Sequence, residues 1–244
     1  TWDLVQALRA KRRTGRSAKL LFENIGDIFI IDRNPYIQYD IVENPAKLKH
    51  LYKRHQRRLA TVKEGANGDQ QVLEFIAKIE KLDEAFFRKL KETKKLQEKI
   101  FNRLKHITAA GNIHFSPFHR ASHVTDATDW RVEYPVVVVY PDSVHEIQEL
   151  VKAAKKLNLV IIARGGGTGL TGGAIPLLPN TMIINTEKLN NIGKIENTTI
   201  NGKTVPTITV EAGAVTEDVM EYCEHQNYIF ATDPTSAWAC TIGG

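Results

Sequence analysis

Hydrophobic residues in the first half of the chain recur every three or four positions, a spacing typical of amphipathic helices. Residues 2–13 show it with a basic end and predict a short helix. Pro45 suits the first turn of a helix reaching about Val62, and the turn at 65–68 separates it from a longer one ending near His106. The long helix carries an apolar stripe, which the preceding helix can cover if the two form a hairpin. The covering stripe would consist of Leu48, Leu51, Tyr52 and Leu59.

Two apolar runs near the start of the chain depart from this helical pattern. Residues 20–22 and 25–31 are short and rich in isoleucine and phenylalanine, and the turn residues Asn34 and Pro35 follow them. Such runs are typical of strands. We therefore expect a strand or a buried extended segment here.

From Pro135 onward the pattern predicts alternating strands and helices. Residues 136–140 form a continuous apolar run, as in strands buried on both faces. Ser143 and Glu146 have the spacing of a capping box, so a helix begins there, and the apolar run 159–163 completes a β-α-β unit. The apolar face of the helix consists of Val144, Ile147, Leu150, Val151, Ala154 and Leu157. The remaining expected elements are strands at 181–185 and 207–210 and a helix at 217–225 capped by Thr216.

Length and charge divide the chain in two. Its 244 residues exceed the usual size of one domain. Residues 1–110 carry a net charge of +10 and residues 111–244 a net charge of −5. We predict an α+β protein with a basic, mainly helical domain over 1–110 and an α/β domain over 111–244 that opens with a connector at 111–127. The interleaved charges favour a solvated helical surface, while binding of nucleic acid, a membrane surface or a partner protein is the alternative role.

Cysteine and histidine usage bears on metal chemistry and location. Cys223 and Cys240 lack C-x-x-C spacing, which argues against a zinc site, an iron–sulfur site or a disulfide scaffold. Four histidines lie at 106, 114, 119 and 123, but Asp126 and Asp129 are the carboxylates near them, and no metal site is predicted. No apolar run approaches the roughly 20 residues of a membrane span. We expect a cytoplasmic protein, with peripheral attachment at the inner membrane face left open.

The candidate chemistry lies in the segment 164–173, which has six glycines in ten positions directly after the apolar run 159–163. Glycine loses much entropy on folding, so this density indicates positive φ angles or close approach of a ligand. Successive N–H groups in such a turn form a concave anion site, usually for phosphate. Flexible linkers are Gly/Ser-rich and lack an adjoining strand, so a linker is disfavoured.

Two common phosphate loops do not fit. The segment 167–172 matches G-x-G-x-x-G and Glu187 follows about twenty residues later, as in a Rossmann unit. However, Pro176 and Pro179 prevent the required helix, and too few residues remain for a parallel crossover. A Walker loop would need a closing Gly-Lys-Ser/Thr. A strand, a glycine loop without a helix and a second strand remain.

Four motifs in order now carry a family resemblance: 164–173, 210–214, 233–236 and 241–244. Together they resemble the PCMH/VAO-type FAD-binding domain of the FAD-linked oxidase family, in the branch of D-lactate dehydrogenase and the glycolate oxidase D-subunit. The resemblance extends from about Asp126 to the end of the chain. It implies that two loops hold the pyrophosphate and ribityl parts of FAD. The residues implied in FAD binding are Arg164, Gly165, Gly166, Gly167, Thr168, Gly169, Pro234, Thr235, Ser236, Thr241, Ile242 and Gly243.

The resemblance also implies a reaction. The family oxidises 2-hydroxy acids such as D-lactate or glycolate and passes electrons to a separate acceptor or an iron–sulfur partner domain, with no role for nucleic acid. Its substrate residues come mostly from a cap domain beyond the FAD domain, so no catalytic residue is named and the chain is expected to be part of a longer protein. Some members attach FAD through a first-loop histidine, which 164–173 lacks, so FAD is expected to be non-covalent. Arg164 is expected either beside the pyrophosphate or in a salt bridge at the strand end.

Overall fold

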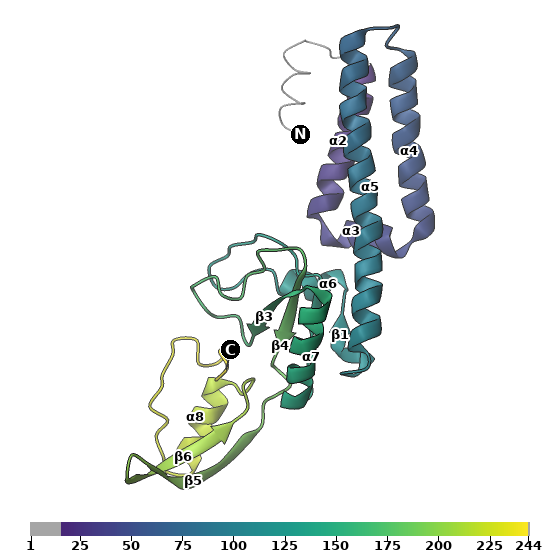
Figure 1. Ribbon diagram of the computed structural model, residues 1–244. Coiled ribbons are helices and arrows are strands. Elements are labelled where there is room, and N and C mark those ends of the chain that lie inside the picture. The colour runs from purple at the N-terminus through teal and green to yellow at the C-terminus, as the bar shows by residue number, and fades with distance from the viewer. Residues whose placement is uncertain (1–15, 244) are drawn as a thin grey trace. The chain divides into compact units, whose positions relative to one another are not determined.

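The computed structural model describes residues 16–243 of the chain (Figure 1). The chain separates into two compact units, Thr1–Glu98 and Lys99–Gly244, which are described one at a time. The helix expected over residues 2–13 lies outside the described residues.

The first unit is helical. Its helices are α2 (Arg16–Arg33), α3 (Pro35–Glu43), α4 (Pro45–Glu64) and α5 (Gln70–Leu104), the last of which continues into the second unit. The Asn34 side chain accepts hydrogen bonds from the first N–H groups of α3, and Asn44 does the same for α4. Each cap is followed by a proline at the first helical position, where its missing N–H costs nothing.

The strand expected within residues 20–31 is wrong, because this segment lies inside α2. Leu21 and Ile25 are four residues apart, so they share one face of a helix. That face packs against α4 and α5 in one buried cluster, and this packing outweighs the strand preference of the β-branched residues. The buried members of the cluster are Leu21, Ile25, Leu59, Val62, Ile76 and Ile79.

Helices α4 and α5 pair through two apolar clusters, as the hairpin prediction requires. Leu51 packs with Phe86, Phe87 and Leu90. Tyr52, expected in the covering stripe, is 47% exposed and touches Phe87 edge-on with 5.1 Å between ring centroids.

Many charged groups of the helical unit pair within that unit. Buried His55 lies with Nδ1 2.9 Å from Asp83 Oδ1. Arg54 and Arg58 both contact Asp27, at 2.9 and 2.7 Å. Further ion pairs are Lys47–Asp40, Lys89–Asp32 and Lys94–Glu43. Many charges of this unit are therefore paired within it, and its role as a solvated surface or a binding surface stays a prediction.

The second unit is built on a four-stranded sheet in the order β1-β2-β4-β3. The segment 111–127 contributes β1 (Ile113–His114) and the short helix α6 (Pro117–Ser122) to it. The other elements are β2 (Val137–Val139), α7 (Val144–Leu157), β3 (Val160–Arg164) and β4 (Thr181–Asn185).

Strands β3 and β4 pair in parallel, so the argument that too few residues remain for a parallel crossover is wrong. The loop between them makes the crossover without a helix. Because β2 is also parallel to β4, the carboxyl ends of β2, β3 and β4 meet at one edge of the sheet. This edge is where open α/β sheets usually bind ligands.

Ser143 is confirmed as the N-cap of α7, but the Glu146 carboxylate pairs with the N–H of Asp142, one residue before the N-cap, in place of the N–H of Ser143. Ser143 Oγ accepts from Glu146 N at 3.2 Å, and Glu146 Oε2 accepts from Asp142 N at 2.9 Å. Leu150 and Ala154 of the expected apolar face are buried, whereas Val144 and Val151 are largely exposed.

A second sheet follows the first. Strands β5 (Ile192–Ile200) and β6 (Lys203–Val210) form an antiparallel hairpin, and α8 (Thr216–His225) comes next. The two strands are joined by the turn Asn201-Gly202, in which both φ angles are positive. An Asn-Gly pair is a strong signal for a hairpin, and it marks β5, which was not among the expected strands. Thr216 does not cap α8 from outside, because it is the first helical residue and its hydroxyl lies 3.3 Å from Cys240 O. Among the helices described, none is long and apolar enough to cross a membrane.

Candidate cofactor site

The glycine loop begins at the carboxyl end of β3, where Arg164 is fixed against the body of the unit. Arg164 is 8% exposed, and its Nη1 donates to Thr125 O at 2.7 Å. Burial lowers the pKa of Arg164, while the neighbouring Asp126 carboxylate raises it. The guanidinium is therefore held beside the loop by the backbone carbonyls of Thr125 and Ala174.

A second loop meets the first. Ser236 O accepts hydrogen bonds from Ala239 N and Cys240 N, which fold the segment into a turn, and Cys240 O accepts from Thr216 N at the start of α8. A Cβ atom on Gly166 would lie 2.0 Å from Ala239 O. Only glycine permits this backbone-to-backbone approach, so the contact between the loops depends on it.

The two loops and Asp126, which lies between α6 and β2, enclose a cleft of about 240 Å³, here called the loop cleft. The predicted residues that line it are Arg164, Gly165, Gly166, Gly167, Thr168, Gly169 and Thr241. The other predicted residues, Pro234, Thr235, Ser236, Ile242 and Gly243, belong to the second loop but are not among its described lining residues. The lining residues that the sequence analysis did not name as cofactor contacts include Asp126, Thr171 and Cys240.

The loop cleft has the features expected of a site for a phosphorylated ligand. Its floor is backbone rich in N–H groups, and Gly167 has a φ of +68°. Two buried side-chain atoms on the cleft residues, Asp126 Oδ2 and Thr241 Oγ1, have no hydrogen-bond partner in the described part of the chain. Buried polar atoms are usually paired, so these atoms fit a cleft that holds a polar ligand.

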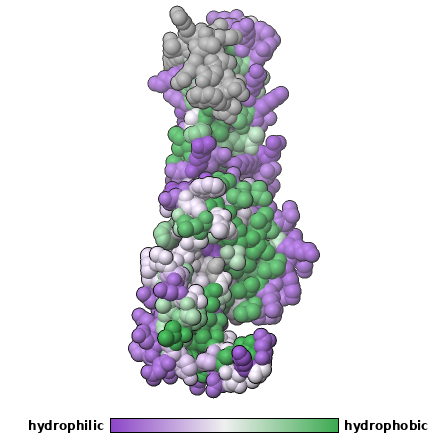
Figure 2. All heavy atoms as spheres, turned by 90° about the vertical axis from the view of Figure 1, so that its left-hand side faces the viewer, coloured by the Kyte–Doolittle hydropathy of each residue, from purple (hydrophilic) through white to green (hydrophobic). Residues whose placement is uncertain are grey.

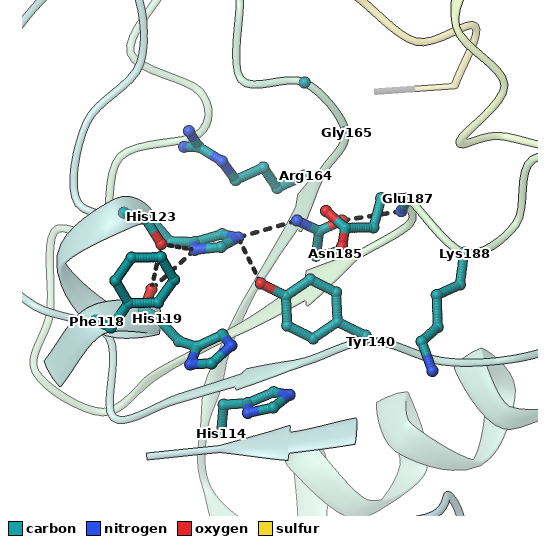
Figure 3. Close-up of a pocket in the computed structure, with 12 residues that line it drawn as sticks. His114, Phe118, His119, His123, Tyr140, Arg164, Gly165, Asn185, Glu187 and Lys188 are labelled. Carbon is teal, nitrogen blue, oxygen red and sulfur yellow. Dashed lines mark hydrogen bonds between the residues drawn. The ribbon is translucent and has the colours of Figure 1, made fainter. Parts of the chain in front are cut away.

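A second, larger hollow of about 530 Å³ borders the same strand ends (Figure 3). We call it the histidine pocket. It shares Arg164, Gly165 and Gly166 with the loop cleft. Its remaining lining residues are His114, Phe118, His119, Ser122, His123, Tyr140, Asn185, Glu187 and Lys188.

Hydrogen bonds fix His123 at the centre of this pocket. Its Nδ1 donates to His119 O at 2.8 Å, so its Nε2 is free to accept from Asn185 Nδ2 at 2.9 Å (Figure 3). Burial of the ring lowers the pKa of His123 to about 4, and the positive charge of Arg164 acts in the same direction. Burial also raises the pKa of Tyr140 to about 12. The ring of His123 is therefore neutral at pH 7 and joins α6 to β4.

The histidines do not form a metal centre in the described residues. His119 and His123 have the i, i+4 spacing of a helical ligand pair. Instead of converging with His123, the His119 ring stacks on His114 with 3.7 Å between centroids. No group of three or more His, Cys, Asp or Glu side chains in the described part of the chain is arranged to hold a metal ion.

Comparison with known proteins supports the flavin interpretation of the second unit. Residues 135–244 match the family model of a FAD binding domain, and residues 1–88 match a family described as a protein of unknown function (DUF3683). The chain is 29% identical over 108 residues to the mitochondrial D-2-hydroxyglutarate dehydrogenase of Danio rerio, covering 44% of this chain and 19% of that protein. It is 26% identical over 115 residues to glycolate oxidase subunit GlcD of Escherichia coli K12, covering 45% and 21%. The chain thus spans about a fifth of the length of these relatives.

Solved structures agree at the level of the fold. Alkyldihydroxyacetonephosphate synthase superposes with a TM-score of 0.52 at 23% identity, over 60% of this chain and 30% of that one. p-Cresol methylhydroxylase gives a TM-score of 0.50 at 18% identity, over 60% and 28%. The expected FAD-binding fold is confirmed over residues 135–244, which match the family model of a FAD binding domain and share the fold of these solved structures.

Proposed function

We propose that this chain supplies the first part of the FAD-binding domain of a flavin-dependent dehydrogenase that oxidises a 2-hydroxy acid. Arg164, the 165–169 backbone and Thr241 would hold the cofactor in the loop cleft, and the rest of the second loop would support Thr241. When bound, FAD would supply the two-electron oxidation of the hydroxy acid, and the electrons would go on to a separate acceptor or an iron–sulfur partner domain. The residues of this chain bind and orient the cofactor.

One observation carries this proposal: the two loops identified from the sequence meet at a cleft. Gly166 allows the contact with Ala239, and the residues that line the cleft include both the glycine loop and Thr241. Such a junction presents backbone donors to a phosphorylated ligand from two segments that are far apart in the sequence.

The substrate class is proposed from the relatives. Their names include D-2-hydroxyglutarate dehydrogenase, a putative D-lactate dehydrogenase of Schizosaccharomyces pombe and a glycolate oxidase subunit. All three names refer to 2-hydroxy acids, so the proposal extends to the class and leaves the individual acid to experiment.

The purified full-length protein should lose its yellow colour when a 2-hydroxy acid is added without oxygen, because the bound flavin becomes reduced. D-2-hydroxyglutarate, D-lactate and glycolate are compared. The matching 2-oxo acids are the controls, because they are the oxidised products and cannot reduce the flavin. Bleaching by at least one hydroxy acid and by none of the oxo acids supports the proposal. A flavin that stays oxidised with all three acids but bleaches with dithionite would contradict the proposed substrate class.

A further inference from the structure

The loop cleft contains a carboxylate that the glycine motif does not predict. Asp126 lies between α6 and β2 and is 7% exposed, yet its Oδ2 has no hydrogen-bond partner in the described part of the chain. Thr241 Oγ1, also on a residue that lines the cleft, is buried and unpaired as well. Leaving such atoms unpaired costs free energy, so a ligand that pairs with them gains affinity.

The other oxygen of Asp126 fixes the carboxylate in place. Oδ1 accepts from Thr128 N at 2.9 Å and from Thr128 Oγ1 at 2.6 Å. The next residue, Ala127, donates its N–H to Gly169 O in the glycine loop at 3.2 Å. Asp126 is therefore held at the loop by a local turn, and besides Thr128 the Gly172 N–H of the glycine loop also acts on its carboxylate and lowers its pKa. Among the described residues, Oδ2 is the oxygen left without a partner on this cleft-lining residue.

The charge of this group limits what can lie beside it. The hydrogen bonds from Thr128 lower the pKa of Asp126, so the carboxylate is ionised at neutral pH and can only accept hydrogen bonds. Arg164 offsets part of this negative charge, since the Asp126 carboxylate acts against burial and raises the pKa of Arg164. A phosphate placed directly at Oδ2 would still be repelled, whereas a hydroxyl group would donate a charge-assisted hydrogen bond. Thr241 Oγ1 can donate to or accept from a second hydroxyl of the same ligand.

We propose that Asp126 is a hydroxyl-recognising residue of the loop cleft, whose Oδ2 accepts a hydrogen bond from the polyol part of the bound flavin dinucleotide while Thr241 contacts the same part. This inference rests on the proposed function. It divides the cleft in two: the polyol lies at Asp126 and Thr241, and the phosphates lie at the backbone N–H groups of 165–168. The polyol is either the ribityl chain or the ribose of FAD.

Asp126→Asn in the full-length protein tests whether the negative charge of Asp126 contributes to FAD binding. The amide keeps an oxygen for the Thr128 bonds but loses the negative charge at the Oδ2 position. FAD affinity, measured by quenching of flavin fluorescence, is expected to fall about tenfold, the difference between a charged and a neutral hydrogen bond. The matched control is Asp129→Asn, because Asp129 is exposed and its φ of +60° suits asparagine, and its affinity should equal that of the wild type.

The direction in which Asp126→Asn changes FAD affinity tests the inference. Tighter FAD binding by Asp126→Asn would mean that phosphate lies beside the carboxylate, and unchanged binding would mean that no ligand hydroxyl reaches it; either result overturns the inference while FAD binding itself stands. A wild-type protein that does not bind FAD would overturn the proposed function and this inference together.

FAD analogues lacking single hydroxyl groups identify the group that Asp126 contacts. One deoxyribityl or deoxyribose analogue should bind the wild type about tenfold more weakly than FAD and bind Asp126→Asn with little additional loss. Such non-additivity is the signature of a direct contact. If every analogue weakens binding equally in both proteins, Asp126 does not contact a hydroxyl and the inference is wrong.

Discussion

Gly167→Val in the full-length protein should abolish FAD binding, with a loss of affinity of at least about a hundredfold. Gly167 has a φ of +68°, which a β-branched residue adopts only with strain. A Cβ at this position would also lie 2.2 Å from Arg164 Nη2 and 2.5 Å from Arg164 Cζ. Arg164 cannot easily move aside, because it is buried and donates to Thr125 O.

The substitution therefore distorts the glycine loop and displaces the guanidinium at the same time. Each charge-assisted hydrogen bond to the phosphates contributes about 1.5–3 kcal/mol, and several would be lost together. FAD affinity is measured on the variant, with circular dichroism to check that it is folded. Gly111→Ala is the control, because a Cβ there meets no atom within 4 Å and should leave affinity unchanged. Near-normal affinity in Gly167→Val would show that the loop does not hold FAD.

Acid should weaken the second unit through His123. Its pKa is 6.5 when unperturbed and about 4 in the folded protein, so the unfolded chain takes up a proton first as the pH falls. The stability contributed by the neutral ring is complete above pH 6.5 and declines as the pH falls toward 4. This difference in pKa corresponds to as much as about 3 kcal/mol. His114, whose pKa is also lowered by burial, adds in the same direction.

Denaturant unfolding of the full-length protein at several pH values between 6.5 and 4, followed by tryptophan fluorescence, to which Trp130 and Trp238 of this unit contribute, measures the effect. His123→Gln keeps a group that can accept from Asn185 and should reduce the loss of stability in acid. Exposed His145→Gln should retain the loss seen in the wild type. An identical pH dependence in His123→Gln and the wild type would contradict the neutral, buried state of His123.

Local signals in the sequence predict much of the second unit. Three kinds of motif predict their local structure without information from the rest of the fold. They are the Ser143 cap of α7, the apolar runs at β2 and β4, and the glycine loop. The parallel crossover from β3 to β4 was not predictable in this way, because the loop makes it without the helix that such connections usually contain. β5 was missed although Asn201-Gly202 marks its hairpin.

The errors in the first unit have a tertiary cause. The β-branched residues of 25–31 favour a strand locally, and α2 is helical because Leu21 and Ile25 bury one face against α4 and α5. Large apolar side chains also remain exposed in the loops of the second unit, including Leu170, Leu177 and Trp238, and hydrophobic surface is visible on this part of the molecule in Figure 2. Which of the apolar residues are buried could not be predicted from the sequence, because burial depends on the tertiary contacts.

In the candidate site, residues within contiguous motifs could be predicted from the sequence, and residues placed there by tertiary contacts could not. The glycines and Thr241, which line the loop cleft, could be named from the sequence because their motifs are contiguous. Asp126 was not named as a contact, because its role depends on the Thr128 turn and on the bond from Ala127 N to Gly169 O, which bring it to the loop cleft. The spatial meeting of Gly166 with Ala239 likewise has no signal in either motif alone.

Hydrogen–deuterium exchange of the full-length protein with and without FAD tests the central claim most directly, because it reports where the cofactor is held. The claim predicts slower exchange on FAD binding at the backbone N–H groups of 165–169 and in the segment 236–243, since the two loops form one site. Protection at other segments, with unchanged exchange in both of these loops, would contradict it.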